Sequence, residues 1–497
     1  MVLPIESALF CQECREKEVS ALPIRRMIRA LCLGLAVTAL GAQGAGTAAA
    51  HDAAVPASRG EITLSFAPVV KKVAPAVVNI FSKRVVQRPV SPLFSDPIFR
   101  RFFGDSFGMQ GVPRERMESS LGSGVIVSPD GLIVTNHHVI GEASEITVVL
   151  ADGRELSAER VLDDKDTDLA VLRIDPGKER LPHVEFRDSD NVEVGDLVLA
   201  IGNPFGVGQT VTSGIVSATA RTQVGISDFS FFIQTDASIN PGNSGGALVT
   251  LDGKLLGINT AIFSRSGGSV GIGFAIPANM VRTVVASAAR GDMVERAWSG
   301  LIGQSLTKDL AEGFGLDRPG GVIVNKVFPG GPADLAGIKS GDIVLAVNGQ
   351  PVPDTDSLRF RIATRELGGQ AKATLWRDRR KLDVSLPLEP APETPARDET
   401  FLEGRHPLVG AVVANLSPAL AEELDLPGAW DGVIITKLQR GSPAHRFRFQ
   451  PGDILIAVNQ VKIMDVKGLV GHLGKKLESW RISFSRDGRV RHVEFTS

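Results

Sequence analysis

The chain has 497 residues, of which 43% are hydrophobic and 22% are charged, and its formal net charge is −2. This length suits roughly three to four domains, and the composition is that of globular proteins with sizeable cores. A nearly neutral chain has no general attraction for nucleic acid or anionic membranes. Only 5% of the residues are aromatic and none is tyrosine, which argues against stacking platforms for single-stranded nucleic acid.

The three cysteines, Cys11, Cys14 and Cys32, all lie near the N-terminus. Structural disulfides, zinc–thiolate sites and a cysteine nucleophile are therefore excluded from the rest of the chain. Cys11 and Cys14 have the spacing of a redox or metal-binding pair, but no strand–helix–strand pattern surrounds them. We predict no function for them in the mature protein.

Residues 1–50 have the organisation of a secretory signal peptide, with a possible N-terminal extension before Met27. Arginines precede an apolar run over 30–40, and small residues follow it up to residue 50. A basic start, a short apolar run and a small-residue end are typical of a cleavable signal. The run is short for a membrane span, and an uncleaved anchor is the alternative. We expect export through a cleavable signal, with no need for membrane association.

The next 245 or so residues, taken as a first domain over 51–295, predict an all-β fold. From residue 73 to 276, short β-branched runs alternate with Gly, Asp-Gly and Asn-Pro turn signals, at the spacing of barrels or sandwiches. Residues 278–290 place apolar side chains at helical spacing and predict a closing helix. The expected strands include the runs 124–127, 146–150, 170–174 and 197–201.

Residues 87–118 interrupt the β pattern with a long segment rich in proline and phenylalanine. A loop of this length is usually functional, and exposed phenylalanine favours association. We predict that it contacts another subunit or gates access to a site. The alternative is an insertion that folds onto its own domain.

The C-terminal half contains a repeat with an offset of 111 residues. Gly321-Val322-Ile323-Val324 returns at 432–435, and Gly341-Asp342-Ile343 returns at 452–454. Two copies are too few for a solenoid, so we predict two similar domains, over 296–388 and 403–497. The proline-rich stretch between them, 389–402, is predicted to be a semi-rigid linker.

The densest chemical signal is Asn240-Pro241-Gly242-Asn243-Ser244-Gly245-Gly246. A nucleophilic serine needs an exposed hydroxyl on a tight turn, with backbone N–H groups free to hold an oxyanion. The glycines permit that turn, and the amides of Gly242 and Ser244 are the natural oxyanion donors. A glycine-rich hairpin turn is the alternative interpretation.

A serine nucleophile also needs a base and a carboxylate. Thr135-Asn136-His137-His138-Val139 offers histidine after a predicted strand, and Asp168 lies directly before another. The carboxylate would fix the tautomer of the imidazole. The chain order His, Asp, Ser is that of the two-barrel serine proteases, whereas α/β-hydrolases have Ser, Asp, His.

These motifs resemble the HtrA (Do-like) family of periplasmic serine proteases, from about residue 65 to the end of the chain. The matching strings are 135–139, 167–170, 240–246 and Gly271–Pro277. The resemblance implies a mostly β protein, with a trypsin-like double β-barrel protease domain followed by two PDZ domains, located in the periplasm. It implies that His138 is the base, Asp168 its orienter and Ser244 the nucleophile, while His137 falls at a variable position and is read as structural.

The residues expected to line the substrate pocket are uncharged. A trypsin-like enzyme that selects basic residues carries a carboxylate six positions before the serine, and this position is Ser238. A small apolar pocket prefers Val, Ala or Ile before the cut. The predicted substrate-binding residues are Ser238, Ile239, Asn259, Thr260, Ala261 and Ile262.

Each repeat carries a loop at the position where PDZ domains hold a peptide carboxylate. PDZ domains bind a peptide C-terminus by adding a strand, and backbone amides take its carboxylate. The predicted loops are Ser299, Gly300 and Leu301 in the first copy, and Val409, Gly410 and Ala411 in the second. PDZ domains usually carry an apolar residue before this glycine. The first copy has Ser299 there, and the second copy, with Val409, is closer to the pattern. The alternative for either copy is a packing module without a ligand.

No P-loop and no His-Glu-x-x-His string occurs, so the sequence gives no support for ATP or a metal, and we predict no cofactor. We expect an ATP-independent endopeptidase for unfolded or damaged proteins that also binds peptide C-termini. The resemblance implies a homotrimer that can assemble into larger cages, together with chaperone activity. Two alternatives are a PDZ-based stress sensor or scaffold whose protease is normally locked, and a protein that acts mainly as a chaperone.

Overall fold

The computed structural model describes residues 65–86, 116–204, 208–222, 231–240, 242–262, 269–291, 294–426, 428–475 and 479–496. The chain divides into two units, Met1–Ser65 and Phe66–Ser497, and the fold below is that of the second unit. The predicted signal peptide and most of the segment 87–118 lie outside the described residues. Among the helices of the described part, none is long and apolar enough to cross a membrane.

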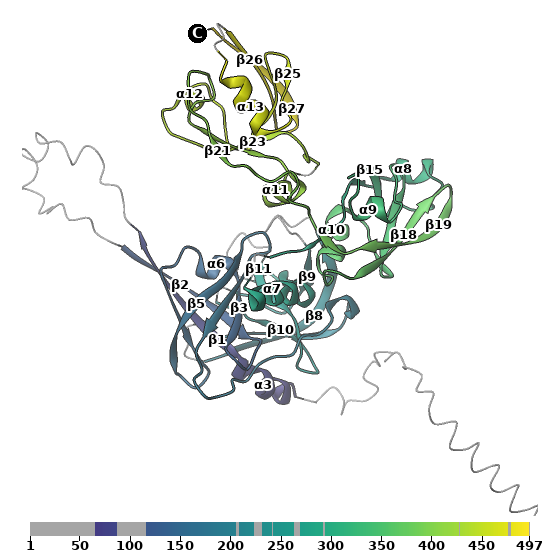
Figure 1. Ribbon diagram of the computed structural model, residues 1–497. Coiled ribbons are helices and arrows are strands. Elements are labelled where there is room, and N and C mark those ends of the chain that lie inside the picture. The colour runs from purple at the N-terminus through teal and green to yellow at the C-terminus, as the bar shows by residue number, and fades with distance from the viewer. Residues whose placement is uncertain are drawn as a thin grey trace, which may run out of the picture. The chain divides into compact units, whose positions relative to one another are not determined.

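Six antiparallel strands form a first closed barrel, in the order β1-β2-β3-β6-β5-β4 (Figure 1). β-Branched side chains favour the pleated backbone, and short turns between the runs allow neighbouring strands to pair. The runs predicted at 124–127, 146–150 and 170–174 fall almost entirely within β2, β4 and β6, which confirms these strands. The bounds are β1 (Val77–Val86), β2 (Arg116–Ile126), β3 (Leu132–Thr135), β4 (Glu145–Val149), β5 (Glu155–Asp164) and β6 (Leu169–Ile174).

A second closed barrel follows, in the order β10-β11-β12-β9-β8-β7. The predicted run 197–201 lies in β7. The two barrels confirm the prediction of a mostly β, trypsin-like double barrel. The bounds are β7 (Leu197–Gly202), β8 (Thr210–Arg221), β9 (Phe232–Thr235), β10 (Ala247–Thr250), β11 (Leu255–Ile262) and β12 (Gly273–Pro277).

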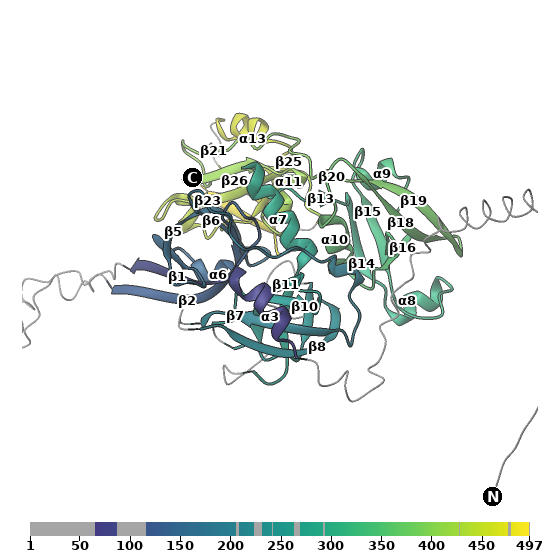
Figure 2. The same ribbon diagram turned by 90° about the horizontal axis from the view of Figure 1, so that it is seen from below.

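Short helices brace the barrels. α3 (Ala67–Val73) and the 3-10 turn η1 (Ala74–Ala76) precede β1, yet Lys72 Nζ donates to the Asp252 carbonyl in the turn between β10 and β11, at 2.9 Å. Figure 2 shows α3 beside strands of the second barrel. α6 (His137–Ile140) follows β3, and η2 (Ser189–Asn191) lies in the chain between β6, the last strand of the first barrel, and β7.

The predicted closing helix is confirmed as α7, which runs over Ala278–Arg290. Val281, Val284 and Ala288 are buried, as their helical spacing requires. Pro277 precedes the helix, and Gly291 ends it in the left-handed conformation with its N–H on helix carbonyls.

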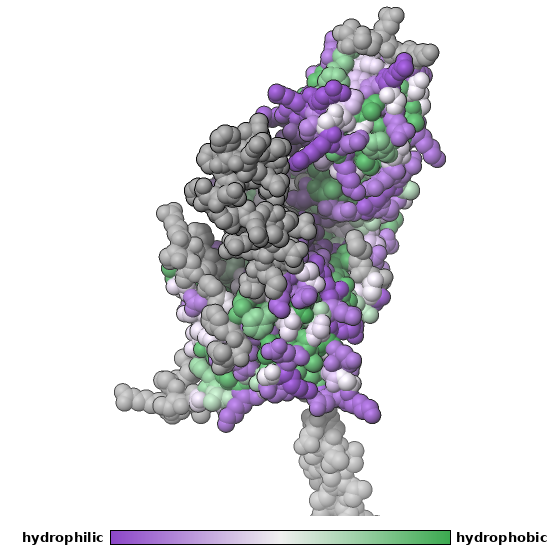
Figure 3. All heavy atoms as spheres, turned by 90° about the vertical axis from the view of Figure 1, so that its left-hand side faces the viewer, coloured by the Kyte–Doolittle hydropathy of each residue, from purple (hydrophilic) through white to green (hydrophobic). Residues whose placement is uncertain are grey.

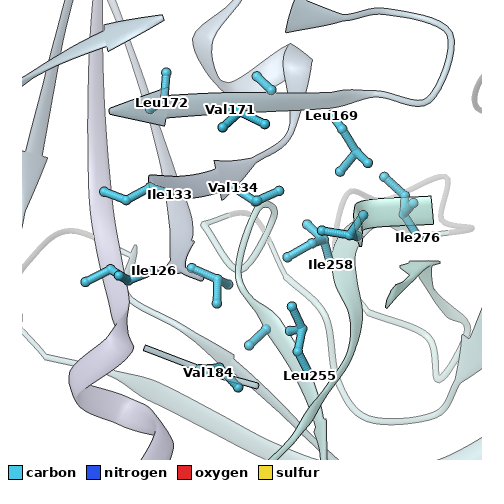
Figure 4. Close-up of a cluster of buried hydrophobic side chains, with 14 of the residues drawn as sticks. Ile126, Ile133, Val134, Leu169, Val171, Leu172, Val184, Leu255, Ile258 and Ile276 are labelled. Carbon is cyan, nitrogen blue, oxygen red and sulfur yellow. The ribbon is translucent and has the colours of Figure 1, made fainter. Parts of the chain in front are cut away.

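One cluster of buried apolar side chains extends through both barrels (Figure 4). Ile133, Val134 and Leu169 come from the first barrel, and Ile258 and Ile276 come from the second. Each fully buried aliphatic side chain contributes roughly 1.5–3 kcal/mol relative to exposure. The two barrels therefore form one packed body, and loops on their facing sides have a fixed relation.

The two repeats have closely similar sheets. In the first, the order is β14-β15-β16-β18-β19, with β17 paired to β16. β13 and β20 form a separate short ladder. The bounds are β13 (Ala297–Trp298), β14 (Leu301–Ser305), α8 (Lys308–Gly313), β15 (Val322–Val327), α9 (Pro332–Leu335), β16 (Ile343–Val347), β17 (Gln350–Pro351), α10 (Thr355–Ala363), β18 (Gln370–Arg377), β19 (Arg380–Pro387) and β20 (Glu389–Pro390).

In the second repeat the order is β21-β22-β23-β24-β26-β27, with β25 paired to β24. The strand β21 has no counterpart among the described residues of the first repeat, and it comes from the segment 389–402 that was predicted as a linker. The bounds are β21 (Thr400–Phe401), β22 (Ala411–Asn415), α11 (Pro418–Glu423), β23 (Val433–Leu438), α12 (Pro443–Arg446), β24 (Ile454–Val458), β25 (Val461–Lys462), α13 (Val466–Leu473), β26 (Ser479–Arg486) and β27 (Arg489–Thr496).

The repeated Gly-Asp motif has a structural reason. Asp342 is 2% exposed and accepts from Arg377 Nε at 2.6 Å, while Asp453 is 0% exposed and accepts from Arg486 Nε at 2.6 Å. A buried carboxylate needs such a partner, since an unpaired buried charge is costly. The same ion pair therefore fixes the end of β18 in one repeat and of β26 in the other.

The surface of the described residues is mixed. On the face in Figure 3, polar residues separate small apolar patches. Scattered apolar residues of this kind are normal for a folded protein and carry no argument for a partner.

Candidate active site

His138 and Asp168 meet on the first barrel. His138 lies in α6, directly after β3, and Asp168 lies directly before β6. β3 and β6 are paired, so the two residues come together at the same end of neighbouring strands. His138 Nδ1 lies 2.8 Å from Asp168 Oδ2 and 2.9 Å from Oδ1, and the His138 backbone N–H donates to Oδ1 at 3.0 Å.

The backbone of Asp168 is held in an uncommon conformation. Its φ is +56°, a left-handed value that aspartate tolerates better than most residues. Its carbonyl accepts from the His137 N–H at 3.1 Å and from Asn136 Nδ2 at 2.9 Å. These bonds offset the strain, which is of order 1–3 kcal/mol, and they position the carboxylate under the imidazole.

A residue of the second barrel completes the surroundings of Asp168. Thr260 Oγ1 donates to Asp168 Oδ2 at 2.6 Å, and the Asp168 side chain is only 11% exposed. A carboxylate that accepts from His138 Nδ1 keeps the ring proton on that nitrogen. The other ring nitrogen, Nε2, is then left with its lone pair, as a general base requires.

Ser244 lies in a turn that only glycine permits. Gly242 has φ +100° and Gly245 has φ +82°. A Cβ on Gly242 would lie 2.4 Å from Pro204 Cβ, and one on Gly245 would lie 2.1 Å from the Ser123 carbonyl oxygen. Both the backbone angles and the close packing exclude other residues at these two positions.

The Ser244 hydroxyl does not point at the imidazole in this structure. Ser244 Oγ donates to the Thr260 carbonyl at 3.2 Å, and no hydrogen bond joins it to His138. Within the described residues, the amides of Gly242 and Ser244 have no hydrogen-bond acceptor. Two N–H groups of the serine turn are therefore available to an incoming oxygen.

Ser123, which was not predicted from the sequence as a functional residue, connects the Ser244 turn to the first barrel. Its N–H donates to the Ser244 carbonyl at 2.9 Å, and its hydroxyl donates to the Gly242 carbonyl at 2.6 Å. The same hydroxyl accepts from the Asn203 N–H at 2.8 Å. Ser123 is fully buried, and its only sequence signal is a hydroxyl between two glycines at the start of an apolar run.

His137 has a different partner from His138. Its Nδ1 lies 2.5 Å from Asp163 Oδ1, and Arg160 pairs with the other oxygen of Asp163 at 3.3 Å. The ring of His137 is therefore engaged on β5 and separated from the Asp168 carboxylate.

The predicted pocket residues divide into buried and accessible ones. Ile239 is 1% exposed and packs in the core of the second barrel, and Asn259 is 0% exposed with its Nδ2 on the Ala247 carbonyl. Thr260 is also buried, and its hydroxyl donates to the Asp168 carboxylate. Ser238 and Ala261 are partly exposed, while the side chain of Ile262 lies outside the described part.

The two predicted carboxylate loops share a backbone geometry. The Gly300 carbonyl accepts from the Phe328 N–H and the Gly410 carbonyl accepts from the Gln439 N–H, both at 2.8 Å. They differ in what occupies the loop amides. Gly410 N–H donates to the carbonyl of Leu402 at 2.9 Å, whereas the equivalent N–H of Gly300 has no acceptor among the described residues. At the next position, Leu301 N–H donates to the Ser299 hydroxyl at 3.4 Å and Ala411 N–H donates to the Leu408 carbonyl at 3.1 Å.

No cluster of three or more His, Cys, Asp or Glu side chains that could hold a metal occurs in the described part of the chain.

Residues 122–258 match the family model of the trypsin-like peptidase domain, and residues 300–388 match that of the PDZ domain. With the double barrel, these matches define the class of protein, a trypsin-like serine endopeptidase that carries a PDZ domain.

Curated relatives narrow the class. Periplasmic serine endoprotease DegP of Escherichia coli K12 is 37% identical over 462 residues, which cover 88% of this chain and 92% of the relative. Periplasmic pH-dependent serine endoprotease DegQ of the same strain is 40% identical over 404 residues, covering 81% and 85%. The solved HtrA-type protease AlgW with decapeptide is 44% identical, covers 66% of this chain and 99% of its own, and has a TM-score of 0.48. The chain belongs to the HtrA family of periplasmic serine endoproteases, which includes DegP and DegQ, and it is a serine endopeptidase of the periplasm.

Proposed function

We propose that the endopeptidase activity uses Ser244 as nucleophile, His138 as general base and Asp168 as the group that orients the imidazole. Ser244 Oγ attacks the scissile carbonyl while His138 Nε2 takes its proton. The bond to the leaving amine then breaks, and His138 gives that amine the proton. Water attacks the resulting ester by the same route and releases Ser244.

The amides of Gly242 and Ser244 are the proposed oxyanion donors. Both are without an acceptor in the described part of the chain, and the glycine turn leaves no side chain in front of them. Each such donor is worth about 10²–10³ in kcat in a preorganised site.

The observation that carries the proposal is the short contact of His138 Nδ1 with Asp168, at 2.8 Å, held in turn by Thr260 from the barrel that bears Ser244. The three proposed residues are thus linked through one residue, because Thr260 also accepts from the Ser244 hydroxyl. In the proposed active arrangement the Ser244 hydroxyl leaves the Thr260 carbonyl and donates to His138 Nε2.

The hydrogen bond from the Ser244 hydroxyl to the Thr260 carbonyl also favours a second candidate function. In this arrangement the serine is not activated, as a sensor or scaffold with a locked protease requires. The two candidates separate on casein hydrolysis by the purified chain against its Ser244→Ala variant. Rapid hydrolysis without any added effector, lost in the variant, supports the protease as the main function. Casein hydrolysis that begins only when a peptide with a free C-terminus is added supports the sensor, and equal hydrolysis by both proteins contradicts the proposed nucleophile.

The substrates we propose are unfolded or damaged polypeptides, cut after small apolar residues. Ser238 and Ala261, both partly exposed and uncharged, support this preference. A peptide library with Val, Ala, Lys or Glu before the cut tests it, and a preference for Lys contradicts it.

We also propose domains at 51–295, 296–388 and 403–497, the last being a second PDZ domain, and assembly as a homotrimer that can form larger cages. The shared sheet order of the two repeats supports the second PDZ domain.

Light scattering on the mature chain, with and without unfolded substrate, tests the assembly. Suppression of aggregation by the Ser244→Ala variant tests the proposed chaperone activity.

A further inference from the structure

The peptide-accepting edge of the second repeat is covered by its own chain. β22 follows the loop Val409-Gly410-Ala411, so a PDZ-type ligand would add as a strand to the edge of β22 away from β23. That edge pairs with β21, with Phe401 opposite Val412. The sheet order confirms that β22 lies between β21 and β23, with no free edge.

The covering segment has the direction of a bound peptide. At the far end of β22, the Arg397 carbonyl accepts from the Asn415 N–H at 2.6 Å. At the loop end, Leu402 N–H donates to the Ala411 carbonyl at 2.8 Å, and Gly410 N–H donates to the Leu402 carbonyl at 2.9 Å. Leu402 therefore stands where the last residue of a ligand would stand, and its carbonyl takes a loop amide that a terminal carboxylate would take.

The side chains follow the alternation of a strand. Leu402 is 3% exposed and belongs to the same buried cluster as Leu408 of the loop and Leu469 of α13. Phe401 is 46% exposed. Since successive side chains point to opposite faces, Thr400 shares the face of Leu402, two positions before it.

The described residues of the first repeat lack this feature. β14 is the last strand of its sheet, and its residues are partly or fully exposed, whereas four of the five residues of β22 are buried. The residue 111 positions before Leu402 is Gly291, which ends α7. The covering strand is therefore particular to the second repeat.

We propose that residues 396–402 are an internal ligand of the second repeat, and that the site they fill takes peptide C-termini of the same chemistry, an aliphatic last residue with threonine two positions before it. An external peptide binds there only by displacing this segment. The inference rests on the proposed function of the second repeat as a PDZ domain.

The test uses the full mature chain with Ser244→Ala, so that no probe is cleaved. The probe is a synthetic peptide of residues 393–402 with a free carboxylate, and its amidated form is the control. Hydrogen–deuterium exchange of residues 411–415 localises binding to β22 and leaves the first repeat out of the readout. We expect no peptide-dependent change in the parent chain.

Leu402→Ala removes the anchoring side chain, and Leu402→Met is the matched control of similar volume. In Leu402→Ala, exchange of residues 411–415 becomes faster, and the carboxylate peptide slows it again at concentrations at least tenfold below those needed by the amidated peptide. Leu402→Met behaves as the parent. Unchanged exchange in β24 and β26 shows that the repeat remains folded.

A second variant avoids any change in the core. Phe401→Cys with Val412→Cys places two cysteines at directly opposite, outward positions in a mature chain that has none. We expect a disulfide that leaves residues 411–415 protected and unresponsive to the peptide. Three outcomes would each overturn the inference. The peptide could protect residues 411–415 in the parent as much as in Leu402→Ala, the amidated peptide could act as strongly as the carboxylate peptide, or the disulfide could fail to form. Residual casein hydrolysis in the Ser244→Ala parent would instead report failure of the proposed catalytic function.

Discussion

The two barrels have the same strand number and similar pairing, yet they supply different parts of the proposed machinery. The first barrel holds His138 and Asp168 through its own backbone, at the ends of β3 and β6. The second barrel holds Ser244 in a turn built from glycines. Rigid strand pairing thus fixes each half separately.

Beyond the shared apolar core, a small number of hydrogen bonds across the barrel interface join the two halves of the site. Thr260 of the second barrel donates to Asp168 of the first, and Ser123 of the first barrel binds the carbonyls of Gly242 and Ser244 in the second. We therefore expect catalysis to depend most strongly on bonds within the first barrel, next on the bonds that cross between the barrels, and least on the segment that connects them.

Asp168→Asn tests the bond between His138 and Asp168 within the first barrel and has the largest expected effect. Asparagine tolerates the left-handed backbone, so the fold is kept, but its amide N–H₂ cannot accept from His138 Nδ1–H. The imidazole then adopts the wrong tautomer, and kcat for peptide hydrolysis falls by about 10⁴. Asp163→Asn changes the partner of His137 and is the matched control. We expect it to change kcat by less than about threefold. Similar losses in both variants would mean that the two histidines are not functionally distinct.

Ser123→Ala tests the crossing bonds. It leaves the Gly242 carbonyl and the Asn203 N–H without their partner in a buried place, at a cost of about 1–3 kcal/mol. We expect kcat to fall by about 10–100-fold with little change in KM, because the serine turn, and not substrate binding, is disturbed. Ser287→Ala removes another buried hydroxyl, in α7, and serves as control. An effect on KM alone would contradict the positioning role of Ser123.

Thr260→Val removes the other bond that crosses between the barrels and has a smaller expected effect. The valine keeps the shape but removes the donor to Asp168 Oδ2, a bond worth about 1–2 kcal/mol to a charged acceptor. We expect kcat/KM on a peptide substrate to fall by roughly tenfold, and Thr260→Ser to restore most of it. Wild-type activity in Thr260→Val would show that the first barrel orients Asp168 unaided.

The segment that connects the barrels is expected to contribute to stability at neutral pH and to lose this contribution in acid. Burial by itself raises the pKa of Asp188, but the bonds from Asn279 and from the Asp190 N–H outweigh it, so the pKa lies below its usual value. A lowered pKa stabilises the fold above the unfolded-state pKa of about 3.9, and this contribution is lost as the pH falls through the folded pKa. The thermal midpoint should therefore decrease below pH 4, less steeply in Asp188→Asn. Identical slopes in the two proteins would remove Asp188 from the account.

The fold was largely predictable because it depends on local patterns. β-Branched runs predicted the strands, helical spacing predicted α7, and the offset of 111 predicted two similar domains. The chain order of His138, Asp168 and Ser244 predicted a catalytic triad, and the structure places His138 in contact with Asp168. These features repeat along the chain or occur in short motifs, so they are visible without coordinates.

The remaining features depend on contacts between distant segments. The role of Ser123 requires the register that brings β2 against the serine turn, and the bond of Ser244 to Thr260 depends on a side-chain rotamer. The strand β21 was predicted as part of a linker because its proline-rich neighbourhood gives no pairing signal. Asn259 and Ile239 were predicted to line a pocket, but their burial is decided by packing around β10 and β11.

The central claim is that Ser244 is the nucleophile and His138 its base. The most direct measurement is labelling of the mature chain with a fluorophosphonate, which reacts with an activated serine hydroxyl, followed by peptide mapping by mass spectrometry. The account predicts one modified residue, Ser244, and loss of labelling in His138→Ala. Labelling of another serine, or equal labelling of Ser244 without His138, would contradict it.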